Sequence, residues 1–333
     1  MAKKILIIRF SSIGDIVLTT PVIRCLKTQY KEDVEIHFLT KSSFKSLLNS
    51  NPHLSVIHTI DKTVLEISNE LKAEKFDLVI DLHHNLRSAI AKKIIGKKSY
   101  SFEKINIQKW VMVNFKIDRL PDVHIVDRYM KCVESLGITN DGAGLDYFIP
   151  AEDEIDISTL PSNFQNGYVG FVIAAKHITK MMPVEKIISI CQKLKRPIVL
   201  LGGVEDLERA EVIAEKLGES VYNACGKYNI NQSASLVRQA EKIITHDTGL
   251  MHIASAFNKD IVSIWGNTIP KFGMYPYLPT GKSKSTIVEV KDLGCRPCTK
   301  IGYDKCPKAH FKCMMEIDEE RIVETTNKSN LKS

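Results

Sequence analysis

Residues Lys3 to Pro21 read KKILIIRFSSIGDIVLTTP. The pattern in this stretch indicates the type of fold. The stretch opens with a short apolar run, Lys3 to Phe10, whose β-branched residues suit a strand that is buried on both faces. Ser11 to Gly14 then predict a tight loop. Thr20 followed by Pro21 is typical of a helix start, because proline fits the first helical position. This order of strand, loop and helix is how a parallel α/β sheet begins.

The alternation of strands and helices continues through the first half of the chain and starts again in the second. Predicted strands cover residues 3–10, 34–39, 55–60 and 76–82, then 168–175, 197–203, 220–224, 242–247 and 260–266. Predicted helices cover residues 21–30, 43–49, 64–72 and 86–95, then 184–193, 206–217, 232–239 and 250–256. Continuous apolar strands between helices indicate a parallel sheet that is covered on both faces. We therefore predict an α/β protein with two Rossmann-like, doubly wound parallel-sheet domains.

The irregular stretch AEDEIDISTLPSNFQNG, residues 151–167, predicts a linker between these domains. A chain of 333 residues is long enough for two domains that each bury a core. The predicted boundaries are 1–155, 165–314, and a C-terminal helical segment, 315–333, which could pack back on the first domain. Ligands bind at the carboxyl ends of the strands in such sheets, so we expect the active site in a cleft between the two halves.

Composition and charge narrow the class of protein. Hydrophobic residues make up 44% and charged residues 26%, which excludes a disordered or fibrous chain. No apolar run approaches the ~18 residues of a spanning helix, and no signal-peptide core is present, so we expect a cytoplasmic protein. The net charge of +7 is uneven, because residues 87–116 carry eight cationic side chains against one acid, Glu103. This basic stretch is either a solvated face or a surface for an anionic acceptor or membrane, and it lacks a nucleic-acid-binding motif.

The first candidate for chemistry is Asp15, which follows the first predicted strand. Gly14 beside it would allow a ligand to approach the backbone closely. Asp15 could cap the following helix, as aspartate often does, or act on a bound substrate. The local pattern leaves both interpretations open.

The second candidate is the motif THDTGLMH, Thr245 to His252, which joins a predicted strand to a helix. Free amide groups at a helix N-terminus form an anion site, and a diphosphate fits the turn at Thr248 and Gly249. A capped helix without a ligand is the alternative. His252 lies about one turn inside the helix, where it could support the loop or simply pack.

Further charged residues follow other strands of the second half. Lys176 and Lys180 flank a strand-to-helix loop, where a lysine can neutralise a phosphate, although surface lysines are common. Glu208 follows the glycine pair at 202–203, and a carboxylate at this place suits ribose hydroxyls.

The eight cysteines fall into two groups. Cys25, Cys132, Cys191 and Cys225 are scattered singly in apolar or helical surroundings and predict no disulfide framework. The others are Cys295, Cys298, Cys306 and Cys313, with His310 between the last two. This second group is compatible with a structural zinc site, with redox-sensitive thiols or with plain packing.

Several ordered motifs together resemble glycosyltransferase family 9, the lipopolysaccharide heptosyltransferases. The motifs are RFSSIGDIVLTTP (9–21), DLHHNLRSA (81–89), TKMMP (179–183), DTGLMHIASAF (247–257) and IWGNTIP (264–270). The resemblance covers nearly the whole chain and implies a GT-B architecture, with two facing domains and inverting transfer that needs neither metal nor cofactor. The sequence departs from the family at Met182, where an aromatic residue is frequent, and at Lys176, where some members have a hydroxyl residue. These departures leave the donor sugar and its base open.

The resemblance also implies roles for individual residues. The first domain would bind the acceptor and the second the nucleotide sugar. The catalytic residues would be Asp15, as general base, and Lys180, as the phosphate contact. The donor residues would be Gly14, Lys176, Glu208, Asp247, Thr248, Gly249, Leu250 and His252. The acceptor residues would be Ser12, Arg87 and Lys92.

The function implied is transfer of a heptose from ADP-heptose to a lipopolysaccharide core or lipid A type acceptor. The partners would be a nucleoside-diphosphate sugar and an anionic glycolipid, with peripheral contact at the cytoplasmic face of the inner membrane and no nucleic acid. Two alternatives remain, a nucleotide-sugar epimerase of the same fold and a noncatalytic nucleotide-binding protein. A dinucleotide oxidoreductase is disfavoured because no G-x-G-x-x-G follows the first strand.

Overall fold

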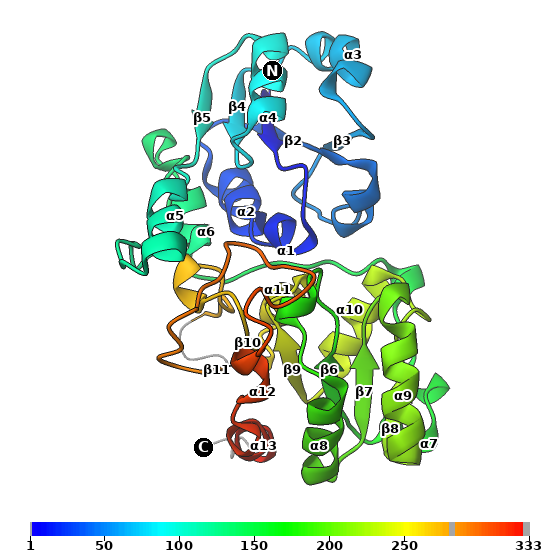
Figure 1. The fold of residues 1–333 in the computed structure, drawn as a ribbon. Coiled ribbons are helices and arrows are strands. Elements are labelled where there is room, and N and C mark those ends of the chain that lie inside the picture. Colours follow the sequence, from blue (N-terminus) through cyan, green and yellow to red (C-terminus); the bar gives the residue numbers. More distant parts are fainter. Residues whose placement is uncertain (1, 280–283, 329–333) are drawn as a thin grey trace. The chain divides into compact units, whose positions relative to one another are not determined.

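The computed structural model describes residues 2–279 and 284–328. The chain forms two compact units, each built around its own parallel sheet (Figure 1). Unit 1 comprises Met1–Lys104 and Val123–Pro150, and unit 2 comprises Ile105–Asp122 and Ala151–Ser333. The predicted α/β class with two parallel sheets is confirmed.

Unit 1 contains a five-stranded sheet in the order β3-β2-β1-β4-β5, with every neighbouring pair parallel. The strands are β1 (Lys3–Ile8), β2 (Val34–Lys41), β3 (Val56–Ile60), β4 (Leu78–Asp81) and β5 (Ser99–Ser101). The helices are α1 (Ile13–Val17), α2 (Thr20–Gln29), α3 (Ser68–Ala73), α4 (Leu86–Ile95) and α6 (Ile125–Met130), with 3₁₀ turns at Ser42–Leu47, Val64–Ile67 and Glu134–Leu136.

Unit 2 contains a six-stranded parallel sheet in the order β11-β10-β9-β6-β7-β8. The strands are β6 (Val169–Val172), β7 (Ile198–Leu201), β8 (Val221–Asn223), β9 (Lys242–His246), β10 (Asp260–Trp265) and β11 (Ser285–Glu289). The helices are α5 (Asn106–Phe115), α7 (Ser162–Gln165), α8 (Val184–Leu194), α9 (Leu207–Leu217), α10 (Ile230–Gln239), α11 (Gly249–Ala256), α12 (Lys312–Met315) and α13 (Glu319–Asn327). The 3₁₀ turns are Ala151–Asp153, Ile157–Thr159, Ile178–Lys180, Val204–Asp206, Gly218–Ser220 and Pro270–Phe272.

The central strands of both sheets are apolar on both faces because helices cover both faces. In β1, residues 5–8 are fully buried, and all four residues of β6 are buried. These strands therefore appear in the sequence as continuous apolar runs rather than as alternating patterns. This property made their positions predictable.

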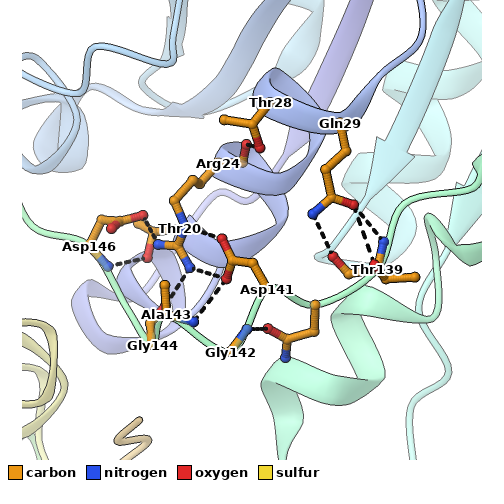
Figure 2. A network of polar contacts seen from close by, with 11 residues as sticks. Thr20, Arg24, Thr28, Gln29, Thr139, Asp141, Gly142, Ala143, Gly144 and Asp146 are labelled. Atoms are coloured by element: carbon orange, nitrogen blue, oxygen red, sulfur yellow. Dashed lines mark hydrogen bonds and ion pairs between the residues drawn. The ribbon is translucent and has the colours of Figure 1, made fainter. Parts of the chain in front are cut away.

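A polar network fixes the end of unit 1 onto α2. Arg24 forms ion pairs with Asp141 and Asp146 and donates to the Gly144 carbonyl, while the Asp146 amide donates to Thr20 (Figure 2). The Arg24 guanidinium holds the pKa of Asp141 down at about 2. Residues 141–146 are thereby tied to α2 without a regular element of their own.

Residues 105–122 lie in unit 2 although they precede the predicted boundary at residue 155. Ile105 and Leu120 bury their side chains with Phe272, and Asp118 pairs with Lys271, so this segment belongs to unit 2. The basic stretch 87–116 is thus divided between the units. The change from unit 1 to unit 2 at Pro150–Ala151 lies near the predicted linker.

The C-terminal helix α13 packs within unit 2. Glu319 accepts from Lys186 and Ser189 of α8, and Ile322 is buried in the unit 2 core. The hydrophobic face of α13 and its acidic first turn both find their partners there. Residues 329–333 of the predicted segment lie outside the described residues.

Candidate active site

In both sheets the candidate residues follow strands that lie where the order of strands in the sheet changes direction. In unit 1 the first strand, β1, lies between β2 and β4, and in unit 2 the first strand, β6, lies between β7 and β9. Loops that leave two such neighbouring strands diverge to opposite faces of the sheet and leave a crevice at the carboxyl edge, where ligands bind in open α/β sheets. Asp15 follows β1, while Lys180 follows β6 and Asp247 follows β9.

Asp15 is held by a buried arginine at the end of β1. The Asp15 carboxylate lies 2.6 Å from Arg9 Nη2, and its side chain is only 20% exposed. The other Arg9 donors reach the carbonyls of Ser11 and Leu82 and the hydroxyl of Tyr129. Burial alone would lower the pKa of Arg9, but Asp15 and Tyr129 outweigh it and raise that pKa. The guanidinium therefore stays charged and fixes one oxygen of Asp15.

Ser12 fixes the second oxygen of Asp15. Its backbone N–H and its hydroxyl donate to Asp15 Oδ2 at 3.2 and 2.8 Å. Asp15 is the third residue of the short helix α1, where a carboxylate commonly satisfies the first amide groups. Asp15 thus does cap a helix, and the same contacts hold a partly exposed carboxylate at the reversal point. Gly14, the residue before Asp15, is buried.

Lys92, predicted to contact the acceptor, forms an ion pair within unit 1. Its ammonium lies 3.0 Å from the fully buried Asp81 and donates to Ser101. Asp81 also accepts from the amides of His83 and His84 and from the Ser88 hydroxyl. Burial raises the pKa of Asp81, but these donors and Lys92 outweigh it, and the pKa is lowered. Lys92 therefore holds the loop after β4 in place, and its contact with the acceptor stays a prediction.

We expect Lys92→Met to lower the free energy of unfolding by roughly 2 to 4 kcal/mol, because Asp81 would keep its charge without its cation. Chemical denaturation of the variant, compared with that of the exposed neighbour variant Lys93→Met, measures the difference. Equal stability of the two variants would contradict the structural role of Lys92.

Other cationic groups surround the same edge of unit 1. The Arg87 guanidinium lies 5.4 Å from the centre of the Phe10 ring, and His83 packs edge-on against that ring. Burial, then the charges of Arg9 and Lys104, lower the pKa of His83 to about 4, so His83 is neutral at pH 7. Burial and Arg9 also lower the pKa of Lys104. The edge is electropositive and suits an anionic ligand.

In unit 2 the structure joins two predicted site residues into one ion pair. Lys180 Nζ lies 2.5 Å from Asp247 Oδ2, and the Thr268 hydroxyl donates to the same oxygen at 3.0 Å. Both charged side chains are mostly buried, with 15% and 13% of their surface exposed. The sequence indicated Lys180 and Asp247 separately but gave no sign of their contact.

The turn after Asp247 presents the start of helix α11. Thr248 is the N-cap residue, and Gly249 and Leu250 begin the helix. Thr248 and Gly249 are half-buried, whereas Leu250 is buried. Their amide groups have no earlier carbonyl of the helix to bind, so the turn can accept an anion. His252 is buried one turn further on.

The remaining donor candidates are more exposed. Lys176 and Glu208 have exposed side chains, Lys176 in the loop after β6 and Glu208 in the first turn of α9. The buried Asp206 accepts from the Gly203 amide at 3.0 Å, so Asp206 rather than Glu208 fixes the turn between β7 and α9. Glu208 is left to face solvent or a ligand.

Four cysteines near the C-terminus lie in one region, but among the described residues no three ligand atoms of this group come within 4.8 Å of one another. Cys295 lies 3.9 Å from His310, and the thiol of Cys298 donates to the Cys295 carbonyl. Burial, followed by Cys295, raises the pKa of Cys298 to about 11, and burial, followed by Cys298, raises that of Cys313 to about 12. Cys306 contributes to both shifts. Four soft thiolate donors suit zinc, which must displace these protons to bind, and a structural zinc site therefore stays a proposal.

Sequence reasoning missed residues that hold the site residues in place. Tyr129 and Arg9 were not singled out, although Arg9 is a charged residue at the end of an apolar run, which is a usable signal. Arg296 was missed entirely. It donates to the carbonyls of Val290 and Thr268 and pairs with Glu289, and so fixes the loop that carries Thr268.

Comparison with known proteins identifies the family. Residues 64–308 match the family model described as glycosyltransferase family 9 (heptosyltransferase). This chain belongs to glycosyltransferase family 9. It is therefore a glycosyltransferase, and neither the epimerase nor the noncatalytic protein considered from the sequence is retained.

Individual relatives of this family 9 enzyme are similar to it over nearly the whole chain. The chain is 23% identical to lipopolysaccharide heptosyltransferase 1 of Campylobacter coli, covering 96% of this chain and 97% of the relative. A family 9 glycosyl transferase from Veillonella parvula is similar in structure, with a TM-score of 0.77, 22% identity and coverage of 97% and 96%. The E. coli ADP-heptose lps heptosyltransferase II follows with a TM-score of 0.71, 19% identity and coverage of 97% for both chains. These structures show the GT-B fold for this enzyme.

Proposed function

We propose that this glycosyltransferase moves a heptose from ADP-heptose onto a lipopolysaccharide core type acceptor, with inversion at the anomeric carbon and without a metal ion. The relative from Campylobacter coli is named for heptose transfer to lipopolysaccharide, and the E. coli structure for ADP-heptose. The observation that carries the proposal is the Asp15 carboxylate, which Arg9 and Ser12 hold at the reversal point of unit 1.

In the proposed reaction Asp15 takes the proton of an acceptor hydroxyl. The hydroxyl oxygen attacks the anomeric carbon from the face opposite the diphosphate, and the bond between that carbon and the diphosphate oxygen breaks. ADP leaves with the electron pair, and the new glycosidic bond has the opposite configuration. General base catalysis of this kind contributes ~10² to 10⁴ in rate. The charges of Arg9 and Lys104 near Asp15 would also attract an anionic acceptor.

Unit 2 would stabilise the leaving diphosphate. The amide groups of Thr248 and Gly249 provide a positive end of α11, and Lys180 adds a full charge. An ammonium has three N–H donors, of which Asp247 takes one, so Lys180 can bind phosphate without leaving Asp247. These groups would replace the positive charge that a divalent ion supplies in other transferases.

The proposed donor and acceptor can be tested directly. Purified protein is incubated with ADP-heptose, UDP-glucose or UDP-N-acetylglucosamine and with delipidated core acceptors, and products are read by mass spectrometry. We expect a mass increase of one heptose with ADP-heptose alone. Transfer of a hexose from a UDP-sugar in preference would refute the donor assignment, and anomeric proton couplings of the product decide between inversion and retention.

The exposed lysines in the last turn of α4 and just after it would draw the acceptor to unit 1. Lys93, Lys97 and Lys98 are exposed, unlike Lys92. Changing these three to glutamine should raise the apparent KM for an anionic core acceptor several-fold at low salt and weaken its dependence on salt. The unaltered kcat serves as the internal control. An unchanged salt dependence would show that these lysines form only a solvated face.

A further inference from the structure

Two buried histidines contact each other in the sheet of unit 1. His37 lies on β2, and His58 on β3 pairs with Leu39, two residues after His37, so both histidines lie on the same face of the sheet. His37 is 0% exposed and His58 2%. His37 Nδ1 lies 2.9 Å from His58 Nε2, so one hydrogen bond joins the two rings. Neither histidine belongs to the candidate active site.

The contacts of His58 decide which of its nitrogens can bind a further group. His58 Nδ1 contacts the Glu70 carboxylate, which accepts hydrogen bonds, so Nδ1 carries the proton. The Nε2 atom of the neutral ring therefore presents a lone pair toward His37. Histidines that bind a metal almost always donate their other ring N–H to a carboxylate or a carbonyl in this way.

His37 has a second ring nitrogen that lacks a hydrogen bond. Within the part of the chain that the structure describes, His37 Nε2 is buried without a hydrogen-bond partner, and it lies 3.7 Å from Glu35 Oε2. A buried polar atom in this state is costly, and it calls for an explanation. A metal ion at Nδ1 would supply one, because the proton of His37 would then move to Nε2, beside Glu35.

Glu74 completes a set of three metal-binding groups. One ligand atom from each of His37, His58 and Glu74 lies within 4.8 Å of the others. Lys4 Nζ contacts one oxygen of Glu74 at 2.8 Å, which leaves the second oxygen for a metal ion. The Lys4 side chain is 33% exposed and can turn toward solvent.

The charges around the two rings suit a divalent cation. Glu35, Glu70 and Glu74 bring three carboxylates to the cluster, and Lys4 pairs with two of them. The side chains of Glu35 and Glu70 are 45% and 52% exposed, so solvent reaches the carboxylates. These carboxylates therefore offer a cation a path from solvent to the buried nitrogens.

We propose that His37, His58 and Glu74 bind a structural zinc ion. Zinc binds imidazole nitrogens at ~2 Å in tetrahedral geometry, which separates two ligands by about 3.3 Å, close to the 2.9 Å between His37 and His58. Two imidazoles and one carboxylate are a zinc ligand set that leaves the fourth position to water. Phe76 packs edge-on against both rings, at 5.1 and 5.9 Å between centroids, and holds them in place.

The proposed zinc lies away from the groups that take part in transfer. Glu35 pairs with Lys4 near the amino end of β1, and Glu74 precedes β4, whereas Asp15 follows the carboxyl end of β1. Zinc would therefore tie β2 and β3 to the end of α3 and stabilise unit 1. The site is independent of the proposed function and is compatible with a reaction that uses no metal ion.

Zinc binding by the full-length, metal-free protein tests the site. The background is Cys295→Ser with Cys298→Ser, which removes the cysteine group as a second zinc site. Competition with a chromophoric chelator should show one zinc ion bound per chain in this background. Cobalt in place of zinc should give the visible absorption of a tetrahedral ion without the near-ultraviolet charge-transfer band of a thiolate ligand.

Ligand variants in the same background locate the ion. Glu74→Gln and His58→Gln should each weaken zinc binding at least ~10-fold. The matched control is His53→Gln, which alters a half-buried histidine of unit 1 outside the cluster. Zinc should raise the Tm of the background protein but not that of Glu74→Gln, and magnesium should raise neither. Circular dichroism checks that the variants fold, and the cobalt spectrum needs no change in the cluster.

Three results would overturn the proposal. The first is failure of the background protein to bind zinc, and the second is unchanged zinc affinity in both Glu74→Gln and His58→Gln. The third is a thiolate charge-transfer band in the cobalt spectrum of the background protein, because other cysteines would then hold the ion. Loss of transfer with intact zinc binding would affect only the proposed function.

Discussion

Asp15→Asn is expected to lower the rate of transfer by ~10² to 10⁴ while donor affinity stays within a few-fold of wild type. The amide keeps the shape of the side chain but cannot take the proton of the acceptor hydroxyl. Steady-state transfer with saturating donor, together with titration of donor binding, measures the two effects. Transfer within a few-fold of wild type would remove Asp15 as the base.

The structure predicts that Asp15→Asn also lowers the stability of the protein, which the sequence motif alone does not show. Asp15 pairs with Arg9, which is 8% exposed, so Asn at position 15 leaves a buried cation without its counter-charge. We expect a loss of roughly 1 to 3 kcal/mol in the free energy of unfolding, since the Asn oxygen can still accept a hydrogen bond.

A double variant distinguishes the loss of the general base from the loss of the ion pair between Arg9 and Asp15. Arg9→Met with Asp15→Asn removes both charges and should regain part of the lost stability without regaining transfer. Recovery of transfer in the double variant would mean that Asp15 acts by neutralising Arg9 rather than as the base. Ser12→Ala, which removes the hydroxyl contact to Asp15 but keeps the carboxylate, should have a much smaller effect.

The second large effect is expected at Lys180. Lys180→Ala should reduce kcat by ~10² to 10³, the loss typical of removing one contact that stabilises developing charge. Lys180→Arg keeps the charge and should retain more activity than the alanine variant. Because Lys180 pairs with Asp247, Asp247→Asn is the matched control for the ion pair itself. If Asp247→Asn and Lys180→Ala reduce kcat equally, the lysine acts through the ion pair and not on the diphosphate.

Activity should also survive excess EDTA if protein groups supply the positive charge. Immediate loss that magnesium or manganese restores would refute the metal-free reaction and would make Asp247 a candidate metal ligand. A slow loss over hours has a different meaning, because a structural ion at Cys295, Cys298, Cys306 and Cys313 would exchange slowly. Short and long exposures to EDTA distinguish these outcomes.

The sequence alone predicted the parts of the fold that depend on local pattern. The strands that became β1, β4, β6 and β10 are apolar because helices cover both sides of them, and burial of this kind leaves a continuous run in the sequence. The missed strands β5 and β11 lie at sheet edges, as the predicted strands β3 and β8 also do, and β5 was missed because SYS at 99–101 contains no apolar run. Helix α5 was missed because its outward face is as apolar as its packed face, which hides the helical period.

The residues of the candidate site could be predicted from the sequence, but the contacts between them could not. Asp15, Lys180, Asp247 and the turn at 248–249 could be predicted, because each directly follows a recognisable strand or sits in a motif that resembles the family. Their partners could not be predicted, since Arg9 meets Tyr129 across 120 positions and Lys180 meets Asp247 across 67. Lys92 was predicted only as an acceptor contact, and its ion pair with buried Asp81 was not foreseen. Charge pairs of this kind depend on which strands become neighbours in the sheet, and only the tertiary structure decides that.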